Sequence, residues 1–228
     1  AVSLMGRKDT TEAACALLSG IPVSRETWER LETFVGLLRK WQPAQNLVSP
    51  ATLEEVWTRH VADSLQLLPL IGPGSTILDM GSGAGFPGMV LAIAASAMPE
   101  QHRFDVHLCE SNKRKAAFLR TVSRECHARA RVHDDRVEAV FAVLAADRRM
   151  PDMITARALA PLERLFQLAE KAFPKAVCLF HKGRGVELEL SDAKRYWEFD
   201  AEVIPSRVAE DSVVLRITQV SRRRDSSP

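Results

Sequence analysis

A glycine-rich stretch holds the residues best suited to bind a small ligand. An apolar run leads into Asp79-Met80-Gly81-Ser82-Gly83-Ala84-Gly85-Phe86-Pro87-Gly88. Glycine has no Cβ, so a turn of this kind lets a ligand approach the backbone closely. Gly83, Gly85 and Gly88 spell G-x-G-x-x-G, which is typical of dinucleotide-binding turns but is a weak signal alone. A turn that serves only to connect a strand to a helix is the alternative.

Asp79 indicates which ligand this turn accepts. It precedes the first glycine, at a place where a carboxylate would repel a pyrophosphate resting on the N-terminus of the following helix. The same carboxylate suits a cationic ligand that carries an amino group. The pattern D-x-G-x-G-x-G therefore favours S-adenosylmethionine over NAD as the cofactor.

Glu110 is the second candidate for cofactor binding. It ends an apolar run over 104–110, and in a doubly wound sheet the carboxyl ends of the strands face the ligand crevice. A carboxylate there can accept hydrogen bonds from both cis hydroxyls of a ribose. An isolated glutamate is more often a solvated surface residue, but the strand end after a glycine-rich turn favours the ribose role.

A cationic helix over 112–127 is a candidate RNA contact. Lys113, Arg120 and Arg124 share one face of it, while Ala116 and Leu119 point elsewhere at core spacing. A merely solvated charged face is an equally open interpretation.

Absent motifs narrow the methyl acceptor. The fourth expected strand leads into residues 155–161, which lack the Asn/Asp-Pro-Pro-aromatic pattern of enzymes that methylate exocyclic amines. Cys109 and Cys178 lie in expected strands and Cys126 lies late in a helix, so no loop cysteine serves pyrimidine-C5 methylation. Ring nitrogen and oxygen acceptors remain. The scattered cysteines and histidines predict neither a metal site nor a disulfide framework.

The elements that must position these residues follow from hydrophobic periodicity. Amphipathic helices are expected over 24–41, with Ser24 as its cap, and over 52–69. Beyond residue 75, β-rich runs alternate with helical windows. The runs are 76–80, 104–110, 130–133, 153–155, 176–180, 199–208 and 213–220; the helical windows are 87–98, 112–127, 136–146, 161–173 and 185–195.

This alternation predicts an α/β fold of the class I methyltransferase type. The sheet should be Rossmann-like, mostly parallel and seven-stranded, with helices on both faces. The last two runs are joined by a short polar link, so they should form an antiparallel hairpin. The expected division is a cloning remnant and N-terminal helix or arm over 1–23, a helical cap over 24–72, the cofactor-binding domain over 73–221 and a polar tail over 222–228.

Composition sets the class of protein. The chain has 228 residues, of which 46% are hydrophobic and 26% charged, with a net charge of +2. These values are ordinary for a globular protein. The longest apolar stretch, near 89–98, is too short to span a bilayer, and scattered cysteines fit a reducing compartment. We expect a cytoplasmic protein, without a membrane partner, that is a monomer.

Several short motifs occur together in an order that resembles one known family. They are Asn46-Leu47, Arg59-His60-x-x-Asp63-Ser64, the stretch from Asp79 to Gly88, Arg136-Val137-Glu138, Arg157-Ala158 and Lys182-Gly183. Together they resemble the RsmG family, also called GidB or glucose-inhibited division protein B, over about residues 24–220. The resemblance implies a methyltransferase that uses S-adenosylmethionine to methylate N7 of a guanine in 16S ribosomal RNA of the small subunit.

The resemblance also implies roles for single residues. Gly81 and Phe86 would line the cofactor pocket, Val137 and Glu138 would flank the adenine or simply start a helix, and Arg157 would lie beside the transferred methyl. A salt bridge from Arg157 to Asp79 or Asp152 is the alternative for that residue.

Further motif residues concern RNA and the helical cap. Arg59, His60 and Lys182 are RNA-binding candidates, and His181 stands where the family has a hydrophobic residue. The role of Asn46, Asp63 and Ser64 is open, and one interpretation is purely structural: they would cap helices and hold them against the sheet. Since guanine N7 has a lone pair and no proton to lose, no catalytic base is expected, and Phe86 could stack on the base. The alternatives are a non-catalytic RNA- or ribosome-binding module and, less favoured, an NAD-linked oxidoreductase.

Overall fold

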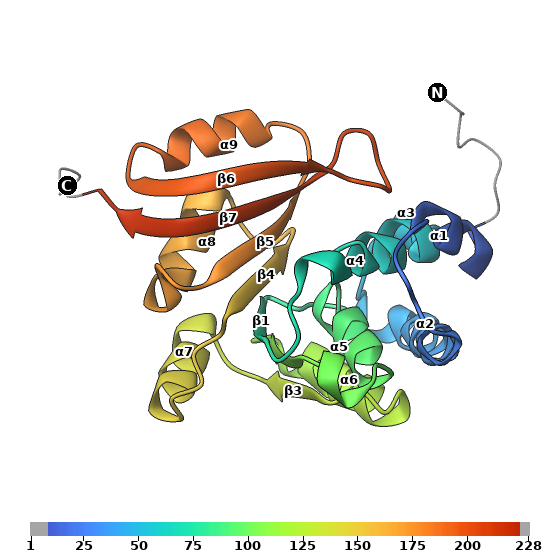
Figure 1. Ribbon diagram of the computed structural model, residues 1–228. Helices are drawn as coiled ribbons and strands as arrows, with labels where there is room; N and C mark the ends of the chain where they lie inside the picture. Colours follow the sequence, from blue (N-terminus) through green and yellow to red (C-terminus); the bar gives the residue numbers. More distant parts are fainter. Residues whose placement is uncertain (1–8, 224–228) are drawn as a thin grey trace.

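The fold is built on one seven-stranded sheet with the strand order β3-β2-β1-β4-β5-β7-β6 (Figure 1). The computed structural model describes residues 9–223. The strands from β3 to β5 pair in parallel, and β7 pairs antiparallel with both β5 and β6. The strands are β1 (Thr76–Met80), β2 (Asp105–Cys109), β3 (Ala130–His133), β4 (Met153–Arg157), β5 (Val177–Lys182), β6 (Trp197–Pro205) and β7 (Val213–Arg222). The expected mostly parallel sheet with a terminal hairpin is confirmed.

Helices cover both faces of the sheet, as the crossover connections require. In Figure 1, α5 and α6 lie on the same side as α2, and α7, α8 and α9 lie on the other. Their bounds are α5 (Gly88–Ser96), α6 (Lys113–Glu125), α7 (Val137–Ala146), α8 (Leu162–Ala169) and α9 (Val186–Ala193). The expected 161–173 helix ends sooner, because a 3-10 turn over Glu170–Ala172 replaces its last residues.

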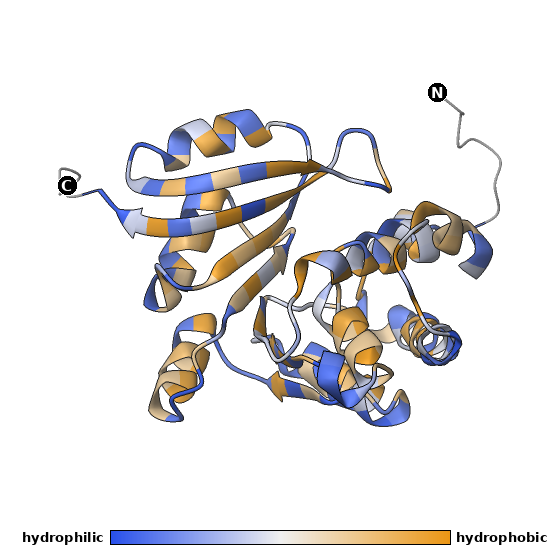
Figure 2. Cartoon of the chain, viewed as in Figure 1, coloured by the Kyte–Doolittle hydropathy of each residue, from blue (hydrophilic) through white to orange (hydrophobic). Residues whose placement is uncertain are grey.

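Two hydrophobic cores lie against the two faces. Successive residues of β1 point to opposite sides, so Ile77 belongs to one core and Leu78 to the other. Residues 88–95 of α5 are all buried, and Figure 2 shows this helix as largely apolar. The first core also contains Leu31, Phe34 and Leu38 of α2, so the helical cap packs into the same core as the sheet.

The helical cap departs from expectation in two places. Helix α2 (Arg25–Gln45), capped by Ser24, continues through Pro43 instead of ending at residue 41. The expected helix over 52–69 is wrong as a single element. It is divided into α3 (Pro50–Leu53), the π-helix η1 (Val56–Ala62), α4 (Asp63–Leu65) and the 3-10 turn η2 (Leu68–Leu70).

A contact from the N-terminal arm explains where the π-helix begins. The Asp9 carboxylate accepts hydrogen bonds from the backbone N–H groups of Trp57 and Thr58, both at 2.9 Å. It thereby satisfies donors that a helix start leaves unpaired. The arm continues into α1 (Thr11–Leu17). The expected cloning remnant and most of the polar tail lie outside the described residues, but Arg222 belongs to β7 rather than to a tail.

Candidate active site

The glycine-rich turn joins β1 to α5 and is held from both sides. Ser82 N–H donates to the Cys109 carbonyl at 2.9 Å, which ties the turn to the end of β2. Gly81 has a φ of +67°, and an added Cβ would come within 2.6 Å of the Leu159 side chain. Gly88 lies so close to Asp79 that a Cβ would collide with the carboxylate. These close approaches explain why glycine stands at both positions.

Asp79 is held within the protein. The residue is only 1% exposed, and its contact with a ligand stays a prediction. One carboxylate oxygen accepts from Thr155 Oγ1 at 2.7 Å and the other from Gly88 N–H at 3.2 Å. Burial raises the pKa of Asp79 to about 6 although these hydrogen bonds act to lower it. Asp79 therefore fixes the turn to β4 and to the start of α5.

Glu110 lies where its position predicted, directly after β2 and beside the turn. One oxygen accepts from Gly83 N–H at 2.9 Å and the other from Asn112 N–H at 2.7 Å. A carboxylate has about four acceptor positions, so each oxygen can accept a further hydrogen bond. Glu110 can therefore shape the turn and still accept from a ribose. Gly83 and Gly85 share the left-handed backbone of Gly81 in this turn.

Phe86 does not offer a free ring face. Its ring is stacked on the His60 ring, with centroids 4.7 Å apart, and packs against Phe34 at 5.3 Å. Burial and the nearby Arg157 and Arg59 lower the pKa of His60 to about 3, so this imidazole is neutral. A neutral imidazole brings no positive charge to a phosphate, and the RNA contact of His60 stays a prediction. The expected stacking of a guanine on Phe86 would require the His60 ring to move.

Arg157 pairs with Asp63, not with Asp79 or Asp152. Its Nε lies 3.4 Å from an Asp63 oxygen, and its Nη2 donates to the Arg59 carbonyl at 2.8 Å. His181 donates from Nε2 to the Asp63 carbonyl at 2.8 Å. This cluster joins the helical cap to the ends of β4 and β5. It gives Asp63 and His181 a structural role that the sequence left open.

The residues expected at the adenine lie at the start of α7. Val137 is buried in the second core, and Glu138 is exposed with an oxygen 3.6 Å from Arg164. The helix-start interpretation of this pair is confirmed. The Cys109 thiol lies 3.4 Å from the Asp135 carbonyl, which places this segment beside the end of β2. Their contact with adenine stays a prediction.

The expected RNA-binding cations differ in whether they are paired with a carboxylate of the protein. Lys113 is exposed and forms no ion pair with the described residues. Arg120 pairs with Asp134 at 2.9 Å and Arg124 with Glu125 at 3.0 Å, and Arg59 lies 3.3 Å from Glu55. These pairs are largely exposed and therefore weak. Lys182 is different, because its buried ammonium lies 2.6 Å from Glu189.

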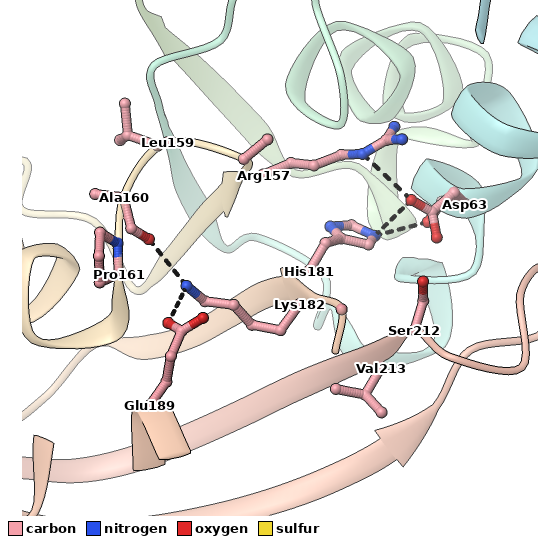
Figure 3. Close-up of a pocket in the computed structure, with 12 residues that line it drawn as sticks. Asp63, Arg157, Leu159, Ala160, Pro161, His181, Lys182, Glu189, Ser212 and Val213 are labelled. Carbon is pink, nitrogen blue, oxygen red and sulfur yellow. Dashed lines mark hydrogen bonds and ion pairs between the residues drawn. The ribbon is translucent and has the colours of Figure 1, made fainter. Parts of the chain in front are cut away.

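A pocket of about 450 Å³ opens beside the turn, at the ends of β4 and β5 (Figure 3). Leu159, Ala160 and Pro161 form one wall, and Arg157, His181 and the Lys182–Glu189 pair form the others. The sequence analysis did not single out Leu159 or Glu189. The only signal for Leu159 was its place in the turn after the fourth expected strand, at the ligand-binding edge.

Nucleophilic cysteine chemistry and metal ligation find no support in the described part of the chain. Its cysteines are all free, and burial raises the pKa values of Cys109 and Cys126 to about 12. No group of three or more potential ligand side chains is placed to hold a metal ion within residues 9–223. In the same range, no helix combines the length and apolar character needed to cross a membrane.

The sheet order, the glycine turn and the carboxylate after β2 define a class I methyltransferase fold that binds S-adenosylmethionine. Solved structures share it. MtNAS, crystallised as a mutant in complex with S-adenosylmethionine, has a TM-score of 0.54 at 15% identity, covering 94% of this chain and 85% of that one. The O-methyltransferase from Bacillus cereus, in complex with SAH, has a TM-score of 0.53 at 12% identity, covering 91% and 97%.

Sequence comparison defines the family. Residues 27–213 match the GidB family, described as rRNA small subunit methyltransferase G. The protein of that name from Rhodospirillum centenum is 47% identical, with 88% of each chain covered. The one from Methylorubrum extorquens is 42% identical over 93% of this chain and 98% of its own. The chain therefore belongs to the family of ribosomal RNA small subunit methyltransferase G, which confirms the resemblance seen in its motifs.

Proposed function

We propose that this protein transfers a methyl group from S-adenosylmethionine to N7 of one guanine in 16S ribosomal RNA. The observation that carries this proposal is the shared position of Leu159. This side chain lies against Gly81 of the cofactor turn and also forms a wall of the pocket. A ligand on the turn and a base in the pocket would therefore meet beside Leu159.

The residues of the turn fit the cofactor. Gly81 and Gly83 add no side chain of their own to the turn, and Glu110 retains acceptor capacity for a ribose. Asp79 holds this turn in place through its hydrogen bonds with Thr155 and Gly88. When bound, S-adenosylmethionine supplies a methyl group on a positively charged sulfur that can be transferred to a nucleophile.

The protein's own residues then need only to align the reactants. Guanine N7 carries an in-plane lone pair and no proton, so no side chain must act as a base. Positioning alone can supply a large part of a rate enhancement. Asp63 and Glu189 line the pocket, and each is already paired there with a cation, Arg157 and Lys182 respectively. Arg157 is a candidate positioning residue, not an acid or base.

We further propose that the substrate is the small ribosomal subunit or its RNA, and that the exposed face of α6 contacts RNA phosphates. Lys113, Arg120 and Arg124 are exposed on this helix, and Figure 2 shows hydrophilic segments along it. N7 is inaccessible in the deep groove of an RNA helix, so the target guanine should be unpaired or turned outward. A monomer acting in the cytoplasm completes the proposal.

The decisive experiment uses methyl-labelled S-adenosylmethionine and small subunits, or their RNA, that lack the modification. The label should appear on one guanine, and borohydride followed by aniline should cleave the RNA there, a treatment selective for 7-methylguanosine. Activity should survive a metal chelator, and the single-turnover rate should stay nearly flat between about pH 7 and 8. A label on a pyrimidine or an exocyclic amine would overturn the N7 assignment. Binding without transfer would instead support a non-catalytic RNA-binding module.

A further inference from the structure

The pocket beside the cofactor turn contains a charged pair next to the wall formed by Ala160 and Pro161 (Figure 3). Lys182 Nζ donates to Glu189 Oε2 at 2.6 Å and to the Ala160 carbonyl at 2.9 Å. Glu189 Oε2 also accepts from Leu162 N–H at 2.8 Å, at the start of α8. The lysine side chain is 9% exposed and that of Glu189 is 30% exposed. The lysine is therefore held in the wall of the pocket, and the carboxylate reaches its open space.

This pair has hydrogen-bonding capacity left over. Both hydrogen bonds to the Glu189 side chain end on Oε2, so Oε1 accepts nothing from the described residues. An ammonium has three N–H donors, of which Lys182 uses two. An acceptor and a donor thus stand side by side in a pocket with an apolar wall. Such a combination reads the edge of a base rather than a phosphate.

We propose that the Lys182–Glu189 pair selects guanine, with Glu189 Oε1 accepting from the exocyclic N2 amino group and Lys182 donating to O6. This inference rests on the proposed function, because it identifies what holds the base while N7 is methylated. The N2 and O6 groups lie on the six-membered ring, and N7 lies on the five-membered ring. N7 lies next to O6 on the same edge of the base, so a guanine whose O6 accepts from Lys182 holds N7 on the side of the pocket formed by Ala160 and Leu159.

The same pair rejects adenine. Adenine has an amino group where guanine has O6, and it has only a C–H where guanine has the N2 amino group. Lys182 would then face a donor, and Glu189 would lose its partner. A buried polar group left unpaired is a strong basis for discrimination. Glu189 is thus a specificity-determining residue, and Lys182 acts on the base instead of the RNA backbone.

The experiment compares guanosine with inosine at the methylated position, because inosine lacks only the N2 amino group. Wild-type protein should methylate the guanosine substrate with a kcat/KM roughly 10- to 100-fold higher than the inosine substrate, the range expected for one hydrogen bond to a charged group. In Glu189→Gln, the amide oxygen can keep the hydrogen bonds from Lys182 and Leu162, and the amide Nε2 then stands where Oε1 was. A donor there cannot accept from the N2 amino group. The preference should then fall to about one.

Two controls separate recognition from damage to the fold. Glu187→Gln removes the same charge from an exposed position on α9 and should keep the wild-type preference. S-adenosylmethionine affinity should be unchanged in both variants. A purely structural role of Glu189 would lower both rates equally and leave their ratio intact, and that result would overturn the inference. If wild-type protein methylates no guanine N7, the proposed function fails instead.

Discussion

Two buried carboxylates near the cofactor turn, Asp79 and Glu110, have different roles. Asp79 is enclosed and connects the turn to β4 and α5, whereas Glu110 bonds to the turn and has an acceptor position left on each oxygen. Both side chains lie at the ends of neighbouring parallel strands, β1 and β2. Sequence position therefore locates such residues well, but it does not say which way each carboxylate faces.

Replacing Glu110 by Gln should weaken S-adenosylmethionine binding. The substitution keeps the size of the side chain but removes the charge and turns one acceptor into a donor. Each charge-assisted hydrogen bond to the ribose contributes about 1.5–3 kcal/mol, so the Kd should rise roughly 10- to 100-fold. Isothermal calorimetry measures this directly. Asp105→Asn, at the exposed opposite end of β2, is the matched control and should bind normally. An unchanged Kd in Glu110→Gln would remove this residue from the site.

The ion-pair partner of Arg157 could not be predicted from the sequence. The spacing of Arg157 offered Asp79 and Asp152, which are near it in the expected sheet. The actual partner is Asp63, in the helical cap. Asp79 is already engaged by Thr155, and Asp152 accepts from Thr76 N–H at the other end of the strand. Only the packing of the cap against the sheet brings Asp63 into reach.

At the scale of elements, hydrophobic periodicity predicted the sheet well and the cap poorly. Each expected strand exists, because a buried strand in a parallel sheet reads as a short apolar run between helical patterns. The 52–69 segment has an equally regular pattern, with Val56, Trp57 and Val61 buried. Its first break, before η1, coincides with a contact from Asp9, which binds the N–H groups of Trp57 and Thr58 from outside the segment. Periodicity carries no information about such a contact.

Helix α6 provides a prediction about RNA. Reversing the charges of Lys113, Arg120 and Arg124 should leave S-adenosylmethionine affinity unchanged and weaken RNA binding. Loss of about three phosphate contacts should flatten the slope of log K against log salt concentration by roughly two units for single-stranded RNA. The surface pairs of Arg120 and Arg124 contribute little to stability, so the variant should fold.

The control for α6 uses three cations near the amino ends of two strands, outside α6. Reversing Arg149, Lys171 and Lys175 changes the net charge equally, and these exposed residues lie near the amino ends of β4 and β5. A flattened slope in both variants would mean that the overall charge acts on RNA, not the α6 face. An unchanged slope in the α6 variant would return this helix to a solvated surface.

Four histidines of the described chain are buried or half-buried. His60 and His181 stand at the junction of the cap and the sheet, and His107 stacks on His133 between β2 and β3 with ring centroids 5.1 Å apart. Burial is the main cause that lowers each pKa, to about 3 for His60 and to about 4 for His107. The folded protein therefore keeps these imidazoles neutral where an unfolded chain would protonate them.

This difference predicts that stability falls with acidification. Below the ordinary histidine pKa of 6.5, the unfolded state binds protons that the folded state excludes, so the stability present above pH 6.5 is lost as the pH falls toward the lowered pKa values. Asp79 acts in the opposite direction, because its pKa is raised to about 6 and the folded state binds its proton first. His60 and His107 alone exclude two protons against the one that Asp79 binds, and each net proton changes the unfolding free energy by about 1.4 kcal/mol per pH unit.

Urea unfolding of the protein without ligand, measured between pH 7.5 and about 5, tests this balance. The unfolding free energy should decline steadily over that range. His107→Gln removes one excluded proton and should make the decline shallower, whatever it does to stability at pH 7.5, because Gln does not titrate. His102→Gln changes an exposed histidine and should leave the slope as it is. Equal slopes in wild type and His107→Gln would show that this imidazole is protonated in the folded state, and a rise in stability toward pH 5 would show that Asp79 dominates.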